Sequence, residues 1–331
     1  MIETPLTKIL NIRVPIVQGG MHWVSYPSFV AAVSNAGALG ILTALTQPTP
    51  DALRIAIRET RKLTDKPFGV NITILPSIDT PDYAGYAKAA VEEGVRIFET
   101  AGNNPGPLIT YFKSNDCIII HKCTSIRHAQ SAAWHGVDIL SIDGFECAGH
   151  PGEDDIGGLV LLARAAQELK KPYIASGGIA DGRGLAAALA LGAAVMHTGT
   201  RFLCTVESPA HQNIKDKIVS STEQDTVHIF RTLHNSSRVF KNSVSQEVVD
   251  IERRPGGAKF SDIQHLVDGQ KGKKVYETGD PEAGVWSAGS CVGLIKDVPS
   301  CKELVERLER EAEDIIEGLE KLRVRRTDAK L

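Results

Sequence analysis

The feature that most constrains this chain is an eightfold alternation of a short apolar strand with an amphipathic helix. Such an alternation is typical of parallel sheets, in which each crossover connection carries a helix. Eight units favour closure into a barrel over an open, doubly wound sheet. The sequence therefore predicts an α/β fold, a (β/α)8 TIM barrel, with strands at 14–18, 38–43, 68–74, 95–100, 116–122, 137–142, 172–175 and 194–198.

The order of the elements also predicts how the chain is divided. Residues 1–219 hold the repeats, with helices expected to begin near Tyr26, Thr49, Tyr83, Pro105, Ser125, Ile156, Asp181 and Ser208. Residues 220–290 lose the alternation and carry polar patches such as HNSSR, so we interpret them as a smaller, mainly helical subdomain. In the C-terminal segment, 291–331, apolar side chains recur at helical spacing over 300–323, which predicts a long amphipathic helix that packs on the barrel.

Composition narrows the classes of partner. With 37 basic and 40 acidic residues the net charge is −3, which gives no polyanion-binding signature, so nucleic acid is not expected as a partner. No apolar run approaches the roughly 20 residues that span a bilayer, and no signal-peptide core follows Met1, so we expect a cytoplasmic protein without a membrane partner. The six cysteines form no C-x-x-C pair, so we expect reduced core thiols and no metal site.

Two adjacent strands of the predicted barrel end in small and hydroxyl residues. Ser176, Gly177 and Gly178 follow the seventh strand, and Gly199 and Thr200 follow the eighth. Glycine lets backbone N–H groups approach an anion closely, and the loops after these two strands frequently bind phosphate in such barrels. Either cluster alone is equally typical of an ordinary turn. Because both end adjacent strands, we predict that these five residues form a phosphate-binding cup.

Small and polar residues also end other strands. Gly19, Gly20 and Met21 would let a flat ring lie against the backbone, although they could equally tighten the chain before the loop at Trp23. Asn71 and Thr73, on the third strand, offer hydrogen bonds to the polar edge of a ring, or they act as local caps.

Lys122 ends an otherwise apolar strand, DCIIIHK, so its ammonium group must meet a carboxylate or an anionic ligand. Beside a reduced flavin it would stabilise developing negative charge. The alternative is an internal ion pair with Glu99 or Asp143. Asp143 is either that partner or a group that orients a ligand.

His150 lies in the loop after the sixth strand, within the run GFECAGHPGEDD. A single histidine is usually structural, but this one is framed by glycine and proline where a barrel places its active site. A pKa near neutrality would suit proton transfer. We therefore predict a catalytic or substrate-orienting role for His150. The acidic run at 153–155 is expected to be a solvated helix start.

Several longer motifs resemble one known family. They are PIVQGGM at 15–21, PFGVNIT at 67–73, ETAGNNPG at 99–106, IHKC at 120–123, SIDGFECAGHPGEDD at 141–155, IASGGIADGRG at 174–184, TGTRFL at 198–203 and WSAG at 286–289. With these motifs in order, the chain resembles the FMN-dependent nitronate monooxygenases, also called 2-nitropropane dioxygenases. The resemblance implies FMN with its phosphate on the cup, His150 on the substrate side, and cofactor-binding roles for Gly20, Met21, Thr73, Lys122, Asp143 and Ala148.

The resemblance leaves two reactions open. In the first, an alkyl nitronate or nitroalkane reduces the flavin and O₂ reoxidises it, and a histidine orients the anion or removes a proton. In the second, NADH reduces the flavin and a quinone takes the electrons. A histidine base favours the first, whereas the wording of GFECAGHPGEDD is closer to the NADH:quinone reductase branch. The oligomeric state is open too, with a homodimer among the states allowed.

Two alternative interpretations lie outside this family. A barrel resembling inosine monophosphate dehydrogenase also holds a phosphate between glycine-ended strands, but it needs a reactive loop cysteine. Cys147 is the candidate, and its neighbours do not match that family's cysteine loop. A barrel that merely stores flavin is the non-enzymatic alternative. Neither accounts for His150.

Overall fold

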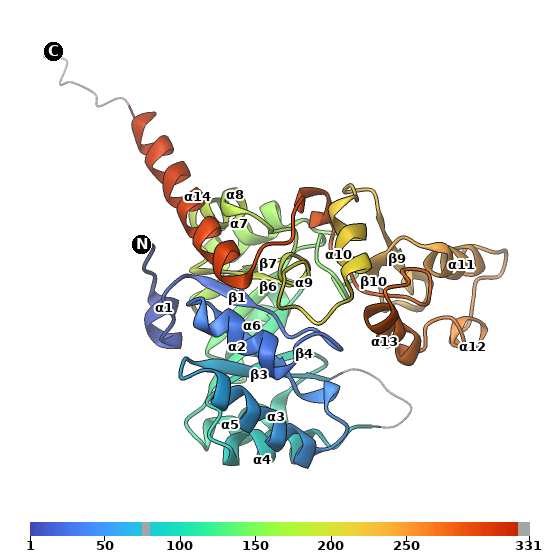
Figure 1. Ribbon diagram of the computed structural model, residues 1–331, viewed down its shortest axis with the longest axis horizontal. Coiled ribbons are helices and arrows are strands. Elements are labelled where there is room, and N and C mark those ends of the chain that lie inside the picture. Colours follow the sequence, from blue (N-terminus) through green and yellow to red (C-terminus); the bar gives the residue numbers. More distant parts are fainter. Residues whose placement is uncertain (75–79, 324–331) are drawn as a thin grey trace, which may run out of the picture.

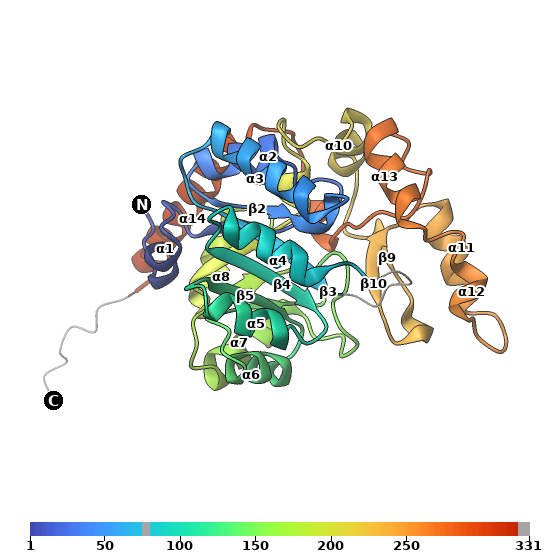
Figure 2. The ribbon, with the colours of Figure 1, turned by 90° about the horizontal axis from the view of Figure 1, so that it is seen from below.

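The computed structural model describes residues 1–74 and 80–323. Eight parallel strands form a closed barrel in the order β1 to β8, and pairing of β1 with β8, from Ile16 opposite Met196, completes the ring. Figures 1 and 2 show the helices packed around this barrel. The strands are β1 (Ile16–Gln18), β2 (Leu39–Thr43), β3 (Phe68–Ile74), β4 (Ile97–Gly102), β5 (Ile118–Cys123), β6 (Ile139–Asp143), β7 (Tyr173–Ser176) and β8 (Val195–Thr198).

All eight predicted strands are confirmed, and their ends differ from the prediction by two residues or fewer. The helices that alternate with them are α2 (Pro27–Asn35), α3 (Pro50–Leu63), α4 (Tyr83–Glu92), α5 (Gly106–Lys113), α6 (Ile126–Trp134), α7 (Gly158–Glu168), α8 (Gly182–Ala190) and α10 (Gln212–Val219). Side chains of Thr49, Ser125 and Asp181 cap three of them by accepting backbone N–H bonds. Two short helices were not predicted, α1 (Pro5–Leu10) and α9 (Thr200–Leu203).

The barrel interior is apolar at one end and polar at the other. Leu6 and Leu10 of α1 pack against the residues that begin several strands, namely Leu39, Ile97, Ile139 and Val195. This helix therefore closes the end of the barrel where the strands start. Active sites in such barrels lie at the opposite end.

Residues 220–290 hold three helices, α11 (Ser243–Glu252), α12 (Phe260–Ile263) and α13 (Gly269–Thr278). They also hold a two-stranded antiparallel sheet, β9 (Thr226–Ile229) with β10 (Ser237–Phe240), which the expectation of a mainly helical segment did not include. The two strands are four residues each and half polar, so their sequences lack a clear strand pattern. In Figure 1 this segment lies beside the barrel. The division of the chain into domains remains a prediction.

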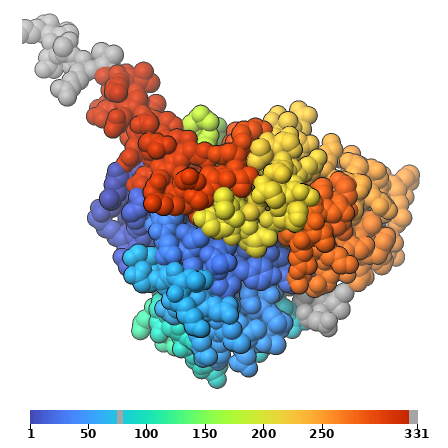
Figure 3. Space-filling model, in the orientation of Figure 1, coloured from blue at the N-terminus to red at the C-terminus, as the bar shows by residue number. Residues whose placement is uncertain are grey.

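The C-terminal helix α14 (Cys301–Lys321) begins at a capping box in which Ser300 and Glu303 bond each other's backbone N–H groups. It packs on α8, where Glu311 accepts a hydrogen bond from Gly182 N–H at 3.0 Å. Glu309 forms an ion pair of 2.5 Å with Arg13. In Figure 3 the helix runs over the body of the molecule and its end projects beyond it. None of the helices in the described part of the chain has the length and apolarity to cross a bilayer.

Candidate active site

Two adjoining cavities open at the end of the barrel where the strands finish. The smaller has a volume of about 220 Å³ and the larger about 840 Å³. Four residues line both of them, Gly20, Lys122, Ala148 and Gly149. The cavities therefore share a wall and form one candidate site with two compartments.

Every site residue predicted from the sequence lies on the wall of one or both cavities. In addition to the shared residues, the smaller cavity is lined by Met21, Ser176, Gly177, Gly178, Gly199 and Thr200. The larger cavity is lined by Thr73, Asp143 and His150. The fold thus brings the predicted cup and the predicted histidine to one site, while their roles stay predictions.

The backbone of the predicted cup offers free donors. Gly177 and Gly178 have φ angles of 89° and 76°, a conformation that glycine adopts without steric cost. Among the residues that the structure describes, none accepts a hydrogen bond from the backbone N–H of Gly177, Gly178 or Gly199. These donors are therefore available to a ligand that brings acceptor oxygens.

The other half of the cup also leaves room for a ligand. A Cβ atom at Gly199 would meet only Met21, at 3.4 Å from the sulfur, which is ordinary contact. Thr200 Oγ1 accepts a hydrogen bond of 3.0 Å from Gly289 N–H, and its hydroxyl group, which also contacts the Cys291 thiol, can donate to an anion. A compact anion such as one phosphate group fits this donor set.

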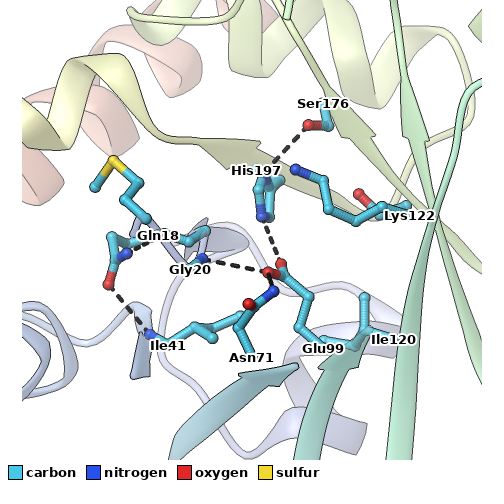
Figure 4. Close-up of polar contacts among 12 residues, drawn as sticks. Gln18, Gly20, Ile41, Asn71, Glu99, Ile120, Lys122, Ser176 and His197 are labelled. Atoms are coloured by element: carbon cyan, nitrogen blue, oxygen red, sulfur yellow. Dashed lines mark hydrogen bonds and ion pairs between the residues drawn. The ribbon is translucent and has the colours of Figure 1, made fainter. Parts of the chain in front are cut away.

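A buried polar network, drawn in Figure 4, contributes to the walls of both cavities. Glu99 of β4 is 1% exposed, and its Oε2 lies 2.7 Å from Nε2 of His197 on β8. Its Oε1 accepts hydrogen bonds from Asn71 Nδ2 at 2.7 Å and from Gly20 N–H at 3.2 Å. On the other side of the imidazole, His197 Nδ1 lies 3.2 Å from Ser176 Oγ. The network therefore links the loop after β1 to the start of the cup.

Glu99 carries the charge of this network. Burial acts to raise its pKa, but His197, Lys122 and Asn71 outweigh burial and lower the pKa to about 2. The group is therefore a carboxylate throughout the neutral range. Glu99 was expected only as an ion-pair partner of Lys122, and His197 was not predicted as a site residue. Glu99 and His197 are titratable residues within the otherwise apolar strands IFETAG and VMHT. Lys122 was selected because it has the same kind of position.

The structure adds a steric reason for two glycines and shows the partners of an asparagine. A Cβ atom at Gly19 would lie 2.1 Å from the His197 ring, and one at Gly20 would lie 2.4 Å from Asn71. Glycine is therefore required there by the barrel's own side chains, whatever ligand lies above. Asn71 directs its amide N–H to Glu99, and its oxygen accepts from the Thr73 hydroxyl at 2.9 Å.

Lys122 forms an internal ion pair with Asp143, which was one of the two alternatives predicted for its ammonium group. Its Nζ lies 3.3 Å from Asp143 Oδ2, and both side chains line the larger cavity. Burial acts to lower the pKa of Lys122, but Asp143 and Glu99 outweigh it and the pKa is raised. The site therefore keeps a permanent ammonium group on the wall shared by the two cavities.

His150 is tied to the chain by one ring nitrogen. Its Nδ1 lies 3.1 Å from the carbonyl oxygen of Ser236. A carbonyl only accepts, so in the neutral ring Nδ1 carries the proton and Nε2 is the proton acceptor. Burial lowers the pKa of His150 below its usual 6.5, which corrects the expectation of a near-neutral value. The imidazole is therefore in its basic form at pH 7.

Cys147 lines the smaller cavity but is not a reactive thiol. It is buried, and burial raises its pKa well above the usual range for a cysteine. A nucleophilic cysteine needs a lowered pKa. This argues against the alternative that resembles inosine monophosphate dehydrogenase.

Comparison with known proteins decides the family. A family model described as nitronate monooxygenase matches residues 3–311. The chain belongs to the nitronate monooxygenase family. The match runs through the barrel, the β9–β10 hairpin and half of α14, so the resemblance of the motifs is confirmed.

Relatives of this nitronate monooxygenase-family protein carry several names. One from Mycobacterium tuberculosis, (3aS,4S,5R,7aS)-5-hydroxy-7a-methyl-1-oxo-octahydro-1H-indene-4-carboxyl-CoA dehydrogenase, is 33% identical over 93% of this chain and 95% of its own. The nitronate monooxygenase of Paraburkholderia phytofirmans is 28% identical over 95% of this chain and 96% of its own. FabK from Thermotoga maritima has a TM-score of 0.90 at 34% identity, covering 97% of this chain and 99% of that one.

A nitroalkane oxidase from Streptomyces ansochromogenes has a TM-score of 0.80 at 26% identity, covering 95% of this chain and 99% of that one. The two solved structures therefore share the fold of this chain over nearly their whole length. The protein is therefore an oxidoreductase of the nitronate monooxygenase family, which is flavin-dependent in general.

Proposed function

We propose that the protein oxidises alkyl nitronates and nitroalkanes with O₂ and uses FMN as its flavin. The observation that carries this proposal is the pairing of an anion cup with a basic imidazole in adjoining compartments that share Lys122. Bound FMN would accept electrons from the substrate and pass them to O₂. Membership of the nitronate monooxygenase family supports the same reaction.

The cup residues are the ones that would hold the phosphate of FMN. The backbone N–H groups of Gly177, Gly178 and Gly199 are free donors, and the hydroxyl group of Thr200 adds one more. Ser176 lies at the start of the cup, where its hydroxyl group is 3.2 Å from His197 Nδ1. This set suits one terminal phosphate. FAD would need a second phosphate site. The flavin ring would then be bound by residues of the shared wall and its surroundings, Gly20, Met21, Thr73, Lys122, Asp143 and Ala148.

Two side chains of the larger cavity, Lys122 and His150, have different roles in the proposed reaction. The ammonium group of Lys122 stabilises negative charge that develops on the ring or on a bound nitronate. Nε2 of His150 accepts the proton of the acidic C–H bond when the substrate is a neutral nitroalkane. His121, which also lines this cavity, is a weaker base, because burial lowers its pKa to about 4 and its Nδ1 bonds the Thr100 hydroxyl at 2.8 Å.

The first prediction concerns the cofactor. We expect the purified protein to be yellow and to hold one non-covalent FMN per chain. Release by heat or acid, followed by chromatography, separates FMN from FAD. A colourless protein that FMN fails to reconstitute would remove the basis of the proposal.

The second prediction concerns pH. Burial disfavours the imidazolium form of His150, so its pKa lies below 6.5 and the base is present above that value. Turnover of a neutral nitroalkane should therefore be level at neutral pH and fall only on the acid side of 6.5, as the ring takes up a proton. Initial rates from pH 5 to 8 test this, and an inflection above pH 7 would contradict it.

The larger cavity favours a second candidate function. Its volume of about 840 Å³ is in the range of cavities that bind drug-sized ligands, so it could hold the flavin ring together with a substrate larger than a small nitronate. The relative from Mycobacterium tuberculosis is named a dehydrogenase of a bicyclic carboxyl-CoA compound. Oxidation of a bulky acyl thioester is therefore the second candidate. The NADH:quinone reaction is a third candidate, which the sequence of the loop around His150 supports.

One experiment separates these functions. The protein is mixed without O₂ with an alkyl nitronate, a neutral nitroalkane, NADH, NADPH or an acyl-CoA, and the absorbance of the flavin is followed. We expect rapid bleaching by the nitronate and nitroalkane. Bleaching by NADH or by the acyl-CoA alone would overturn the proposal in favour of the corresponding alternative.

A further inference from the structure

The hairpin of β9 and β10 is joined to the loop that carries His150, the loop between β6 and α7. Gly149 N–H donates to Arg238 O at 3.0 Å, and Arg238 N–H donates to Gly149 O at 2.6 Å. The two residues thus form an isolated antiparallel bridge. The residue before His150 is therefore paired to β10 as a short strand would be.

Side chains add three further links between the hairpin and this loop. Arg238 Nη2 donates to Phe145 O at 3.0 Å, and the guanidinium group lies 5.1 Å from the centre of the Phe145 ring. His228 of β9 lies against the same ring at 4.4 Å. Arg231 forms an ion pair of 2.5 Å with Asp155 near the end of the loop. The loop is therefore fixed on both sides of His150.

The turn of the hairpin is itself held in an uncommon conformation. Phe230 and His234 have φ angles of 64° and 52°, which residues other than glycine seldom adopt. Glu252 of α11, which is buried, accepts hydrogen bonds from Phe230 N–H at 2.9 Å and from the Thr232 hydroxyl at 2.9 Å. Contacts with α11 therefore help to fix the conformation of residues 230–236, in addition to the contacts with the loop that carries His150.

Ser236, at the end of that turn, connects His150 to a carboxylate. Its carbonyl oxygen accepts from His150 Nδ1. Its backbone N–H and its hydroxyl both donate to Glu153, at 2.7 and 2.6 Å. Ser236 is 1% exposed, whereas Glu153 is exposed. An exposed carboxylate thus holds a buried residue in place with two charge-assisted bonds.

We propose that Glu153 is a positioning residue for His150: by holding Ser236 through both of its donors, it keeps the Ser236 carbonyl on Nδ1. The carbonyl fixes the orientation of the ring and the tautomer in which Nε2 is free to take a proton. The proposal assigns the β9–β10 hairpin a part in proton transfer. The expected effect of Glu153 on turnover rests on the proposed function, because it assumes that His150 is the base.

The test compares four proteins: wild type, Glu153→Ala, Glu153→Gln and Asp154→Ala. The glutamine variant retains an acceptor for Ser236 N–H and an amide partner for the Ser236 hydroxyl. The Asp154 variant removes the same charge one residue away, from a side chain that has no hydrogen bond or ion pair to any described residue. Because Glu153 is exposed, water can replace its carboxylate, so the alanine variant is expected to fold.

Two measurements are made on each protein. With saturating neutral nitroalkane, kcat of Glu153→Ala should fall about 10-fold to 100-fold, the cost of a misplaced catalytic group, with little change in KM. The glutamine variant should recover most of this loss, and Asp154→Ala should match wild type. Nitronate, which needs no proton removed, should be less affected.

The second measurement does not depend on activity. With ¹⁵N-labelled histidine, the imidazole nitrogen signals of His150, assigned by their loss in His150→Asn, should show a single Nδ1–H tautomer in wild type and a mixture in Glu153→Ala. An unchanged tautomer and unchanged kcat in Glu153→Ala would overturn the proposal, as would loss of soluble protein in both Glu153 variants. If His150→Asn leaves nitroalkane turnover intact, the assignment of His150 as the base fails, while the tautomer measurement still decides the role of Glu153.

Discussion

The Gly199→Asp variant is expected to purify without flavin, whereas Gly199→Asn keeps it. The two side chains have nearly the same size, and Gly199 has an ordinary negative φ, so neither strains the backbone. A carboxylate about 4 Å from a phosphate opposes it by about 4 kcal/mol at an effective dielectric constant of 20, which corresponds to a roughly 1,000-fold loss of affinity. The ratio of flavin to protein absorbance measures the result.

The position of Gly199 makes this variant more informative than one at Gly178. Gly199 precedes α9 with an ordinary negative φ, and a Cβ atom there meets only Met21, so a loss of flavin confined to the aspartate variant cannot be ascribed to a damaged helix. Gly178→Asp should also lose flavin, but φ there is 76° and a Cβ atom would lie 2.9 Å from Glu146, so strain adds to repulsion. If the aspartate variants at both positions purify fully loaded, the phosphate binds elsewhere.

The strands and the cup could be predicted because their signals are local. Each barrel strand is a short apolar run bounded by glycine or by a capping residue, so its position follows from about ten neighbouring residues. Ser176 and Thr200 could be selected for the same reason, since a residue at the carboxyl end of a barrel strand, or shortly after it, lies at the active-site end. Local reasoning therefore placed these side chains on the walls of the cavities.

The buried network could not be predicted because its partners lie on opposite sides of the barrel. In a ring of eight strands, β4 faces β8, and Glu99 meets His197 across the interior at 2.7 Å. Which side chains meet there depends on the register and tilt of all the strands. The same network gives a reason for Gly19 that the sequence could not, because the ring that excludes a side chain at that position comes from β8.

The hairpin was missed for a related reason. TVHI and SRVF are short and half polar, and the edge of β10 that faces away from β9 is stabilised by Gly149 and by Trp286 O, which accepts from Phe240 N–H at 2.9 Å. Neither partner is near β10 in sequence. As a consequence the sequence could select His150 from its loop, but not the carbonyl of Ser236 that determines which of its nitrogens is the base.

The His150→Asn variant should lose a factor of roughly 10²–10⁴ in turnover of a neutral nitroalkane, the usual contribution of a general base. The amide N–H₂ of asparagine can still donate to the Ser236 carbonyl, so the loop keeps its anchor while the titratable nitrogen is removed. Steady-state rates with nitroalkane and with the corresponding nitronate, in wild type and variant, measure the effect. His265→Asn, at an exposed histidine that lines neither cavity, is the matched control.

The comparison of substrates is what assigns the role of His150. A nitronate is already deprotonated, so its oxidation should suffer much less than that of the nitroalkane, and the inflection on the acid side of pH 6.5 should vanish from the variant's nitroalkane profile. Equal losses with both substrates would instead indicate that His150 orients the bound anion. Hydride transfer from NADH needs no base, so NADH-driven flavin reduction should change little. If His150→Asn matches wild type with every substrate, His150 is a structural residue, and the preference for nitronate chemistry over the NADH:quinone reaction loses its support.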